Sequence, residues 1–235
     1  STTRFGGMEN AGCIFYDEDA LNGTKSAENL ITHEIAHQWF GNSATEKDWP
    51  HLWLSEGFAT YLTNIYIEET KGDLAFKTQL MQDRNKVVNF DKRYHHPLVD
   101  LDYLNLMDLL NPNSYQKGGW VLHMLRAEIG DELFQQCIQT YYQKYSRSNA
   151  NSKDFQNIVE AVCDRDFSLF FNQWLNRAGH PKLQINSNIK NRKLSLEINQ
   201  KESVFSFPLK VEIKCTDGPT IQRRIRITQE TTRKD

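Results

Sequence analysis

The amino-acid sequence predicts an α+β protein in which a mainly helical region comes first and a small antiparallel β region follows. Between Ser26 and about Ala178 the apolar residues recur at the helical spacing of about 3.6 positions. Beyond the break at Gly179-His180-Pro181 they alternate with polar residues, which is the period of half-buried strands. The change of period predicts two domains, residues 1–179 and residues 180–235.

The first helix of the helical region is bounded by a capping residue and a breaker. Ser26 is the predicted N-cap and Gly41 the predicted stop. An apolar stripe predicts that one face of this helix is buried: Leu30, Ile31, Ile35 and Trp39. A short strand is expected before it, at residues 11–17. Later helices are expected at residues 55–72, from 73 to before Pro97, at 115–129, from 131 onward, at 152–163 and at 166–177.

The β region shows several short segments of alternating apolar residues with polar turns between them. The apolar positions are Leu183 and Ile185, then Leu194 to Ile198, then Phe205 to Cys215, and finally Ile225 and Ile227. Short alternating strands of this kind favour antiparallel pairing and a partial β-sandwich.

Composition excludes several classes of protein. The chain has 235 residues, a formal net charge of −2, 25% charged and 39% hydrophobic residues, which are ordinary values for a soluble globular protein. Three arginines near the C-terminus alternate with isoleucines and read as a solvated strand face, so no nucleic-acid partner is expected. No apolar run is long enough to span a membrane. The sequence shows no targeting signal of its own, so cytoplasmic, periplasmic and secreted locations all stay open.

Two groups of residues outside the main motif could bind a metal or form a crosslink. The four cysteines (Cys13, Cys137, Cys163 and Cys215) form no C-x-x-C pair and read as free or buried thiols, with one disulfide left open. His95-His96 precedes Pro97, where a structural turn is favoured over a second metal site. His123 reads as a packed or surface histidine.

The most informative segment is His33-Glu34-Ile35-Ala36-His37. Two histidines four positions apart lie on one face of a helix, so both imidazoles can reach a single ion. Glu56, near the start of the next helix, can supply a carboxylate oxygen. Two nitrogens, one oxygen and an open fourth position are the ligand set of a catalytic zinc. Glu34 follows the first histidine, where it can meet a water on the metal without binding the metal itself.

The bare pattern also has an ordinary explanation, a solvated helix face whose histidines bind nothing. The apolar stripe argues against it, because buried histidines need partners. A third donor at the start of a second helix argues against it further. The sequence therefore predicts zinc-dependent peptide hydrolysis.

Four motifs, in the same order, resemble the aminopeptidase N family of gluzincin metallopeptidases, which also includes leukotriene epoxide hydrolases. They are Gly6-Gly7-Met8-Glu9-Asn10, the HEIAHQWFGN text at residues 33–42, the WLSEGFATY text at residues 53–61, and Ser114-Tyr115-Gln116-Lys117-Gly118. The resemblance implies a thermolysin-like zinc peptidase catalytic domain followed by a β-sandwich-like segment.

The resemblance also implies a role for each matching residue. His33, His37 and Glu56 would be the ligands of one Zn²⁺, and Glu34 the general base. Tyr115 would stabilise the tetrahedral intermediate. The loop Gly6, Gly7, Met8, Glu9 and Asn10 would bind substrate, with Glu9 gripping its free amino terminus. Apart from the family, Tyr115 reads as an ordinary tyrosine near a helix start and Glu9 as a surface charge.

The partner expected from these roles is a peptide with a free amino terminus. A substrate ammonium about 4 Å from the Glu9 carboxylate gains on the order of 4 kcal/mol at an effective dielectric near 20. Family members are longer, so the chain is expected to be a fragment whose parent protein has further domains, one of which contributes to the amino-terminus pocket in relatives. Two alternatives stay open: a lipid epoxide hydrolase, and an inactive or structural fragment.

Overall fold

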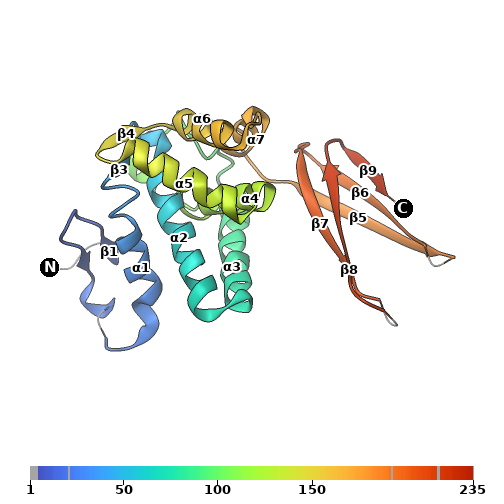
Figure 1. The fold of residues 1–235 in the computed structure, drawn as a ribbon, viewed down its shortest axis with the longest axis horizontal. Helices are drawn as coiled ribbons and strands as arrows, with labels where there is room; N and C mark the ends of the chain where they lie inside the picture. The colour runs from blue at the N-terminus through green and yellow to red at the C-terminus, as the bar shows by residue number, and fades with distance from the viewer. Residues whose placement is uncertain (1–4, 21, 192, 216–217, 235) are drawn as a thin grey trace. The chain divides into compact units, whose positions relative to one another are not determined.

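A computed structural model describes residues 5–20, 22–191, 193–215 and 218–234. It divides the chain into two compact units, Ser1–Ala178 and Gly179–Asp235. The predicted α+β class is confirmed, because helices dominate the first unit and antiparallel strands make up the second (Figure 1).

Seven α-helices form most of the described part of the first unit. They are α1 (Glu28–Ala36), α2 (Trp53–Lys71), α3 (Asp73–Asp91), α4 (Gly118–Ile129), α5 (Asp131–Tyr145), α6 (Ser152–Cys163) and α7 (Ser168–Leu175). α2 contacts α1, α3 and α4 and is the central helix of the unit (Figure 1). Twelve of its nineteen residues are buried, so it is the element against which the functional residues are positioned.

An aromatic core fixes α2 against α5 and α6. Trp53, Phe58, Tyr141 and Phe155 are each at most 1% exposed. The ring centroids of the contacting pairs lie 5.1 to 6.3 Å apart. Trp53 Nε1 donates a hydrogen bond of 2.8 Å to Ser152 Oγ at the start of α6. Aromatic pairs of this kind contribute about 0.5–1.5 kcal/mol each beyond the area they bury.

Two small strand pairs join distant parts of the first unit. β1 (Gly7–Met8) pairs antiparallel with β2 (Phe15–Tyr16), and β3 (Ala44–Glu46) pairs parallel with β4 (Ser148–Ala150). The strand expected at residues 11–17 is therefore shorter than predicted. Gly12 adopts a φ of 71° in a turn, which ends any extended run before Phe15.

Helix α1 differs from the prediction in its start and in its buried face. Thr24 caps a short 3₁₀ turn, Lys25–Ala27, and α1 begins only at Glu28, so Ser26 is not its N-cap. Ile35 is 44% and Trp39 49% exposed, so the expected apolar stripe is wrong at these two positions. Glu34 is among the buried residues of α1, because the polar face of this helix is turned toward α2.

The second unit has five strands in its described part, one more than predicted. They are β5 (Lys182–Lys190), β6 (Lys193–Lys201), β7 (Phe207–Ile213), β8 (Ile221–Ile227) and β9 (Thr231–Lys234). They form a three-stranded sheet, β5-β6-β9, and a two-stranded sheet, β7-β8. Ile198 from one sheet and Ile225 and Ile227 from the other form a shared apolar cluster, as in a sandwich.

Candidate active site

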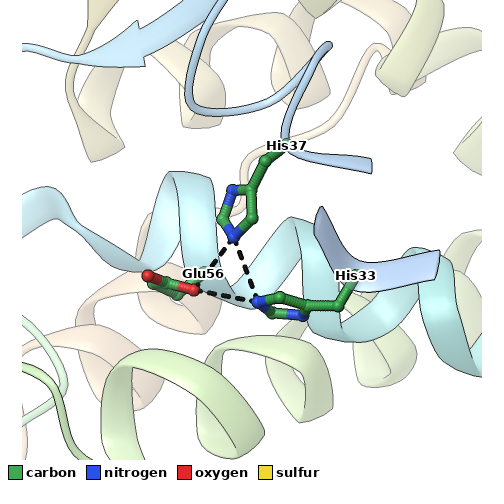
Figure 2. A group of neighbouring side chains, drawn as sticks. All are labelled: His33, His37 and Glu56. Atoms are coloured by element: carbon green, nitrogen blue, oxygen red, sulfur yellow. Dashed lines mark hydrogen bonds and ion pairs between the residues drawn. The ribbon is translucent and has the colours of Figure 1, made fainter. Parts of the chain in front are cut away.

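Three donor atoms from two helices meet at one point. His33 lies on α1, His37 is the C-cap residue one turn later, and Glu56 lies in the first turn of α2. The two Nε2 atoms are 3.0 Å apart, and each lies 3.2 Å from Glu56 Oε2 (Figure 2). Within the described part of the chain, this is the cluster of histidine and acidic residues that could hold a metal ion.

The spacing of these atoms fits a tetrahedral zinc. With bonds of about 2.0–2.2 Å, a tetrahedral zinc holds its ligand atoms about 3.3–3.6 Å apart, slightly farther apart than the 3.0 and 3.2 Å observed here. His37 Nδ1 lies 3.0 Å from the carbonyl oxygen of Phe40, which accepts a hydrogen bond from it in the tautomer that leaves Nε2 free to bind. Two imidazole nitrogens and one carboxylate oxygen match the donor set of a catalytic zinc site.

The charges of the cluster are coupled. Burial disfavours the ionised form of Glu56, but hydrogen bonds from His33 and His37 outweigh it and lower the pKa of Glu56 to about 2. Burial also acts to lower the pKa of His37, but Glu56 outweighs this and raises it to about 9. A carboxylate therefore faces the two imidazoles throughout the neutral range.

Glu34 lies beside the cluster, outside the set of three converging donors. Glu34 is 5% exposed, and burial raises its pKa to about 7. A β-carbon at Gly7 would lie 2.3 Å from Glu34 Oε1, so the carboxylate fills the space that a side chain on β1 would take. The absence of a side chain at Gly7 thus gives Glu34 its place beside the cluster.

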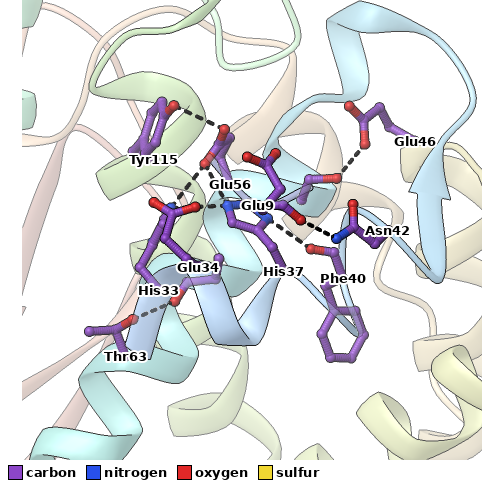
Figure 3. A network of polar contacts seen from close by, with 12 residues as sticks. Glu9, His33, Glu34, His37, Phe40, Asn42, Glu46, Glu56, Thr63 and Tyr115 are labelled. Carbon is purple, nitrogen blue, oxygen red and sulfur yellow. Dashed lines mark hydrogen bonds and ion pairs between the residues drawn. The ribbon is translucent and has the colours of Figure 1, made fainter. Parts of the chain in front are cut away.

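Tyr115 lies in a π-helical turn, Asn113–Lys117, that directly precedes α4. The sequence predicted an ordinary helix from this residue. The Tyr115 hydroxyl donates a 2.9 Å hydrogen bond to Glu56 Oε1, and its ring stacks on His33 at 5.9 Å (Figure 3). Burial, followed by the Glu56 charge, raises the pKa of Tyr115 well above its usual range. The hydroxyl therefore remains a hydrogen-bond donor at neutral pH.

The Gly6–Asn10 segment contributes only in part to the site. Gly7, Met8 and Glu9 line a cavity of about 340 Å³ together with the three-donor cluster, Glu34 and Tyr115, whereas Gly6 and Asn10 are outside its lining. Gly6 adopts a φ of 72° and its carbonyl accepts a 2.7 Å hydrogen bond from Asp17 N. The Asn10 carbonyl accepts a 2.9 Å hydrogen bond from Cys13 N, so both residues form backbone contacts in the turn around Glu9.

Two amides that sequence reasoning missed hold Glu9 in place. Gln38 Nε2 donates a hydrogen bond of 2.9 Å to the carbonyl oxygen of Glu9. Asn42 Nδ2 donates one of 2.6 Å to the same oxygen (Figure 3). Both follow the histidine pair in the same motif. Their place in the HEIAHQWFGN motif could have marked them as functional residues. Their partner, Glu9, lies about thirty residues earlier in the chain, so this contact depends on the tertiary structure.

The cavity has further walls that the sequence did not predict. Its apolar lining comes from Phe5, Leu30, Trp49, Leu52 and Leu110. A fourth carboxylate, Glu46 on β3, also lines it. Ser55 Oγ donates a hydrogen bond to Glu46 Oε2, and burial raises the pKa of this carboxyl.

The remaining histidine and cysteine candidates do not join this site. His95 pairs with Asp91 and His96 with Asp100, each within its own segment, so the two rings do not converge. His123 packs against aromatic rings and lies 3.1 Å from the Tyr61 hydroxyl. All four cysteines are free.

Lys117, two residues after Tyr115, is a buried cation. It is 6% exposed, and burial lowers its pKa to about 8, against the opposing charge of Asp91. The unfolded chain binds this proton up to a pKa of about 10.4. Between these values the unfolded state holds more protons than the folded state, so stability should rise with pH.

We expect the free energy of unfolding to gain up to about 3 kcal/mol from Lys117 between pH 8 and pH 10.5, since one pKa unit corresponds to about 1.4 kcal/mol. Urea denaturation of wild type and Lys117→Met across this range measures the gain. Other titrations are common to both proteins and cancel in the difference. Equal pH profiles for the two proteins would contradict the assignment.

Comparison with known proteins gives consistent matches. Residues 1–174 match the Peptidase family M1 domain. Aminopeptidase M1-C of Oryza sativa subsp. japonica is 31% identical over 207 residues, which cover 83% of this chain and 23% of the relative. Probable aminopeptidase 2 of Sulfurisphaera tokodaii is 31% identical over 226 residues, which cover 89% of this chain and 29% of the relative.

Solved structures share the fold. Legionella pneumophila aminopeptidase A, in complex with aspartic acid, matches with a TM-score of 0.83 at 20% identity, over 97% of this chain and 27% of that chain. An M1 zinc metallopeptidase from Deinococcus radiodurans, bound to a Tyr-Ser-Ala substrate, matches with a TM-score of 0.63 at 23% identity, over 77% of this chain and 39% of that chain. Among the described residues, no helix is long and apolar enough to cross a bilayer.

Proposed function

The chain belongs to peptidase family M1, and from this premise we propose that it is the catalytic part of a zinc aminopeptidase that releases amino-terminal residues from peptides. The observation that carries the proposal is that the three converging donors, Glu34 and Glu9 line one cavity. We assign residues 1–179 to the catalytic domain and residues 180–235 to a separate antiparallel β domain. The chain spans 23% to 29% of the length of the curated relatives named above.

His33, His37 and Glu56 would hold one Zn²⁺ through Nε2, Nε2 and a carboxylate oxygen. When bound, zinc would act as a Lewis acid and would lower the pKa of a coordinated water from 15.7 toward about 7. The hydrogen bond between His37 Nδ1 and the Phe40 carbonyl orients that ring and would leave its Nε2 free to bind the ion.

Glu34 is assigned the general base. Its carboxylate faces the cavity directly after the first ligand in the chain, and burial raises its pKa to about 7, so it can both accept and return a proton near neutral pH. It would take a proton from the attacking water at a carboxylate oxygen and deliver it to the departing amine. Such a positioned acid–base group contributes typically about 10²–10⁴ in rate.

We assign Tyr115 the role of hydrogen-bond donor to the oxyanion. Its hydroxyl is protonated and held at the edge of the cluster by the Glu56 carboxylate, 2.9 Å away. A donor aimed at charge that develops only in the transition state lowers the barrier more than it strengthens substrate binding. Loss of one such donor costs about 3–4 kcal/mol.

Glu9 is assigned the anchor for the substrate's α-ammonium. Its carboxylate lines the cavity, and its backbone is fixed by Gln38 and Asn42. After burial, the Glu9 charge is among the causes that raise the pKa of both Glu34 and Tyr115. An internal peptide bond would leave this carboxylate unpaired, which disfavours endopeptidase activity.

Replacing Glu9 with Gln is expected to lower kcat/KM on free-amine peptides by about 10²-fold, because an attraction of about 4 kcal/mol is largely removed while the side chain keeps its size. Zinc content should not change. Hydrolysis of the same peptides with an acetylated amino terminus is the control and should be slow in both proteins. An unchanged ratio of free to acetylated cleavage would remove Glu9 from the anchoring role.

The proposed function as a whole is tested by assaying this chain on amino-acid arylamides with and without a chelator. We expect release of the arylamine, its loss on zinc removal, and its return when zinc is added back. An intact, zinc-loaded chain with no turnover on any free-amine substrate would contradict the proposal and would favour a structural role.

A further inference from the structure

Helix α2 meets the first residue of α4 at a pair of glycines. A β-carbon added to Gly57 would lie 2.9 Å from the Cα of Gly118, and one added to Gly118 would lie 2.9 Å from the Cα of Gly57. Heavy atoms of real side chains do not approach a backbone this closely. The two backbones therefore touch at a point where neither position has room for a methyl group.

This contact adjoins two residues assigned to the chemistry. Gly57 directly follows Glu56, and Gly118 comes three residues after Tyr115. The Tyr115 hydroxyl and Glu56 Oε1 are 2.9 Å apart. The glycine contact therefore lies close in sequence, on both segments, to the two residues that this hydrogen bond joins.

The turn before α4 is also anchored by two of its side chains. Asn113 Nδ2 donates a 3.0 Å hydrogen bond to the His96 carbonyl, and Ser114 Oγ donates a 2.6 Å bond to the Leu109 carbonyl. Both side chains are at most 4% exposed. These bonds hold the turn to segments other than α2, and the glycine pair is where the residue after the turn meets the α2 backbone.

We propose that Gly57 and Gly118 are positioning residues, whose backbone contact sets the placement of the Tyr115 hydroxyl relative to Glu56 and to the oxyanion. The proposal rests on the proposed function for its catalytic part. Its structural part concerns only the Tyr115–Glu56 contact and is measurable without turnover.

The first test is Gly118→Ala. The crystal structure of this variant should show the Tyr115–Glu56 contact lengthened beyond 2.9 Å. Zinc content should be unchanged, kcat should fall at least about tenfold, and KM should change little, since a displacement near 1 Å can cost about 10²-fold in rate. An unchanged contact with unchanged kcat would overturn the proposal.

The second test is the same change in a Tyr115→Phe background. If Gly118 acts through the Tyr115 hydroxyl, its replacement should lower kcat less than about twofold once the hydroxyl is gone, because residues that act as a unit are not additive. An equal loss of kcat in both backgrounds would show that the glycine acts by another route.

The control is Val121→Ala, a buried cavity mutation on the same helix. It should lower stability but leave kcat within about twofold. If Gly118→Ala does not fold, Gly119→Ala replaces it as a milder perturbation of the same helix contact. Its β-carbon would meet a side-chain atom, Thr60 Cγ2, at 3.3 Å rather than a backbone atom. A chain that shows no turnover as wild type refutes the proposed function, while the Tyr115–Glu56 distance still decides the positioning role.

Discussion

Replacing Glu34 with Gln is expected to leave zinc bound and to lower kcat by about 10²–10⁴-fold. Glutamine has the same shape, so it fits the space beside Gly7, but its amide cannot take a proton from water. KM should change little, because the carboxylate acts on the transition state rather than on substrate binding. Steady-state kinetics with parallel zinc analysis measures the effect.

Glu46→Gln is the matched control for this experiment. Glu46 is a second carboxylate that lines the same cavity, burial raises its pKa as it does that of Glu34, and it has no assigned role in the chemistry. Its loss should change kcat far less. Retained turnover in the Glu34 variant, or an equal loss in both variants, would remove Glu34 from the role of base.

Replacing His37 with Ala is expected to abolish zinc binding at equilibrium and all zinc-dependent turnover. His37 is 1% exposed and supplies one of only three donors, so its loss leaves two ligands and an empty space in the core. Wild type should gain thermal stability when zinc is added, since a ligand that binds only the folded state stabilises it. The variant should gain none.

The control for His37→Ala is His95→Ala, which removes an exposed imidazole that pairs with Asp91 outside the cluster. It should bind zinc as wild type does. Metal analysis after dialysis and thermal denaturation with and without zinc compare the three proteins. Unchanged zinc stoichiometry in His37→Ala would contradict the ligand assignment.

The local part of the site could be predicted from the sequence because helical geometry alone places His33 and His37 on one face. The convergence of Glu56 is a tertiary event, since it requires α1 to pack on α2. It was predictable because the spacing of the motifs resembles the aminopeptidase N family, and membership of family M1 confirms that resemblance.

Other features depended on long-range structure that periodicity does not report. The parallel pair β3–β4 joins residues about a hundred positions apart, and β9 is a polar strand without an apolar alternation. Exposure of Ile35 and Trp39 contradicted the expected stripe, because α1 buries the polar side that carries the chemistry. The π-helical turn that holds Tyr115 likewise has no periodic signal.

The most direct measurement is zinc stoichiometry together with X-ray absorption at the zinc edge of the purified chain. We expect about one zinc per chain, with nitrogen and oxygen neighbours at about 2.0–2.2 Å and the scattering pattern of two imidazoles. A chain that binds no zinc, or a zinc bound by cysteine sulfur at about 2.3 Å, would contradict the assignment of His33, His37 and Glu56 as its ligands.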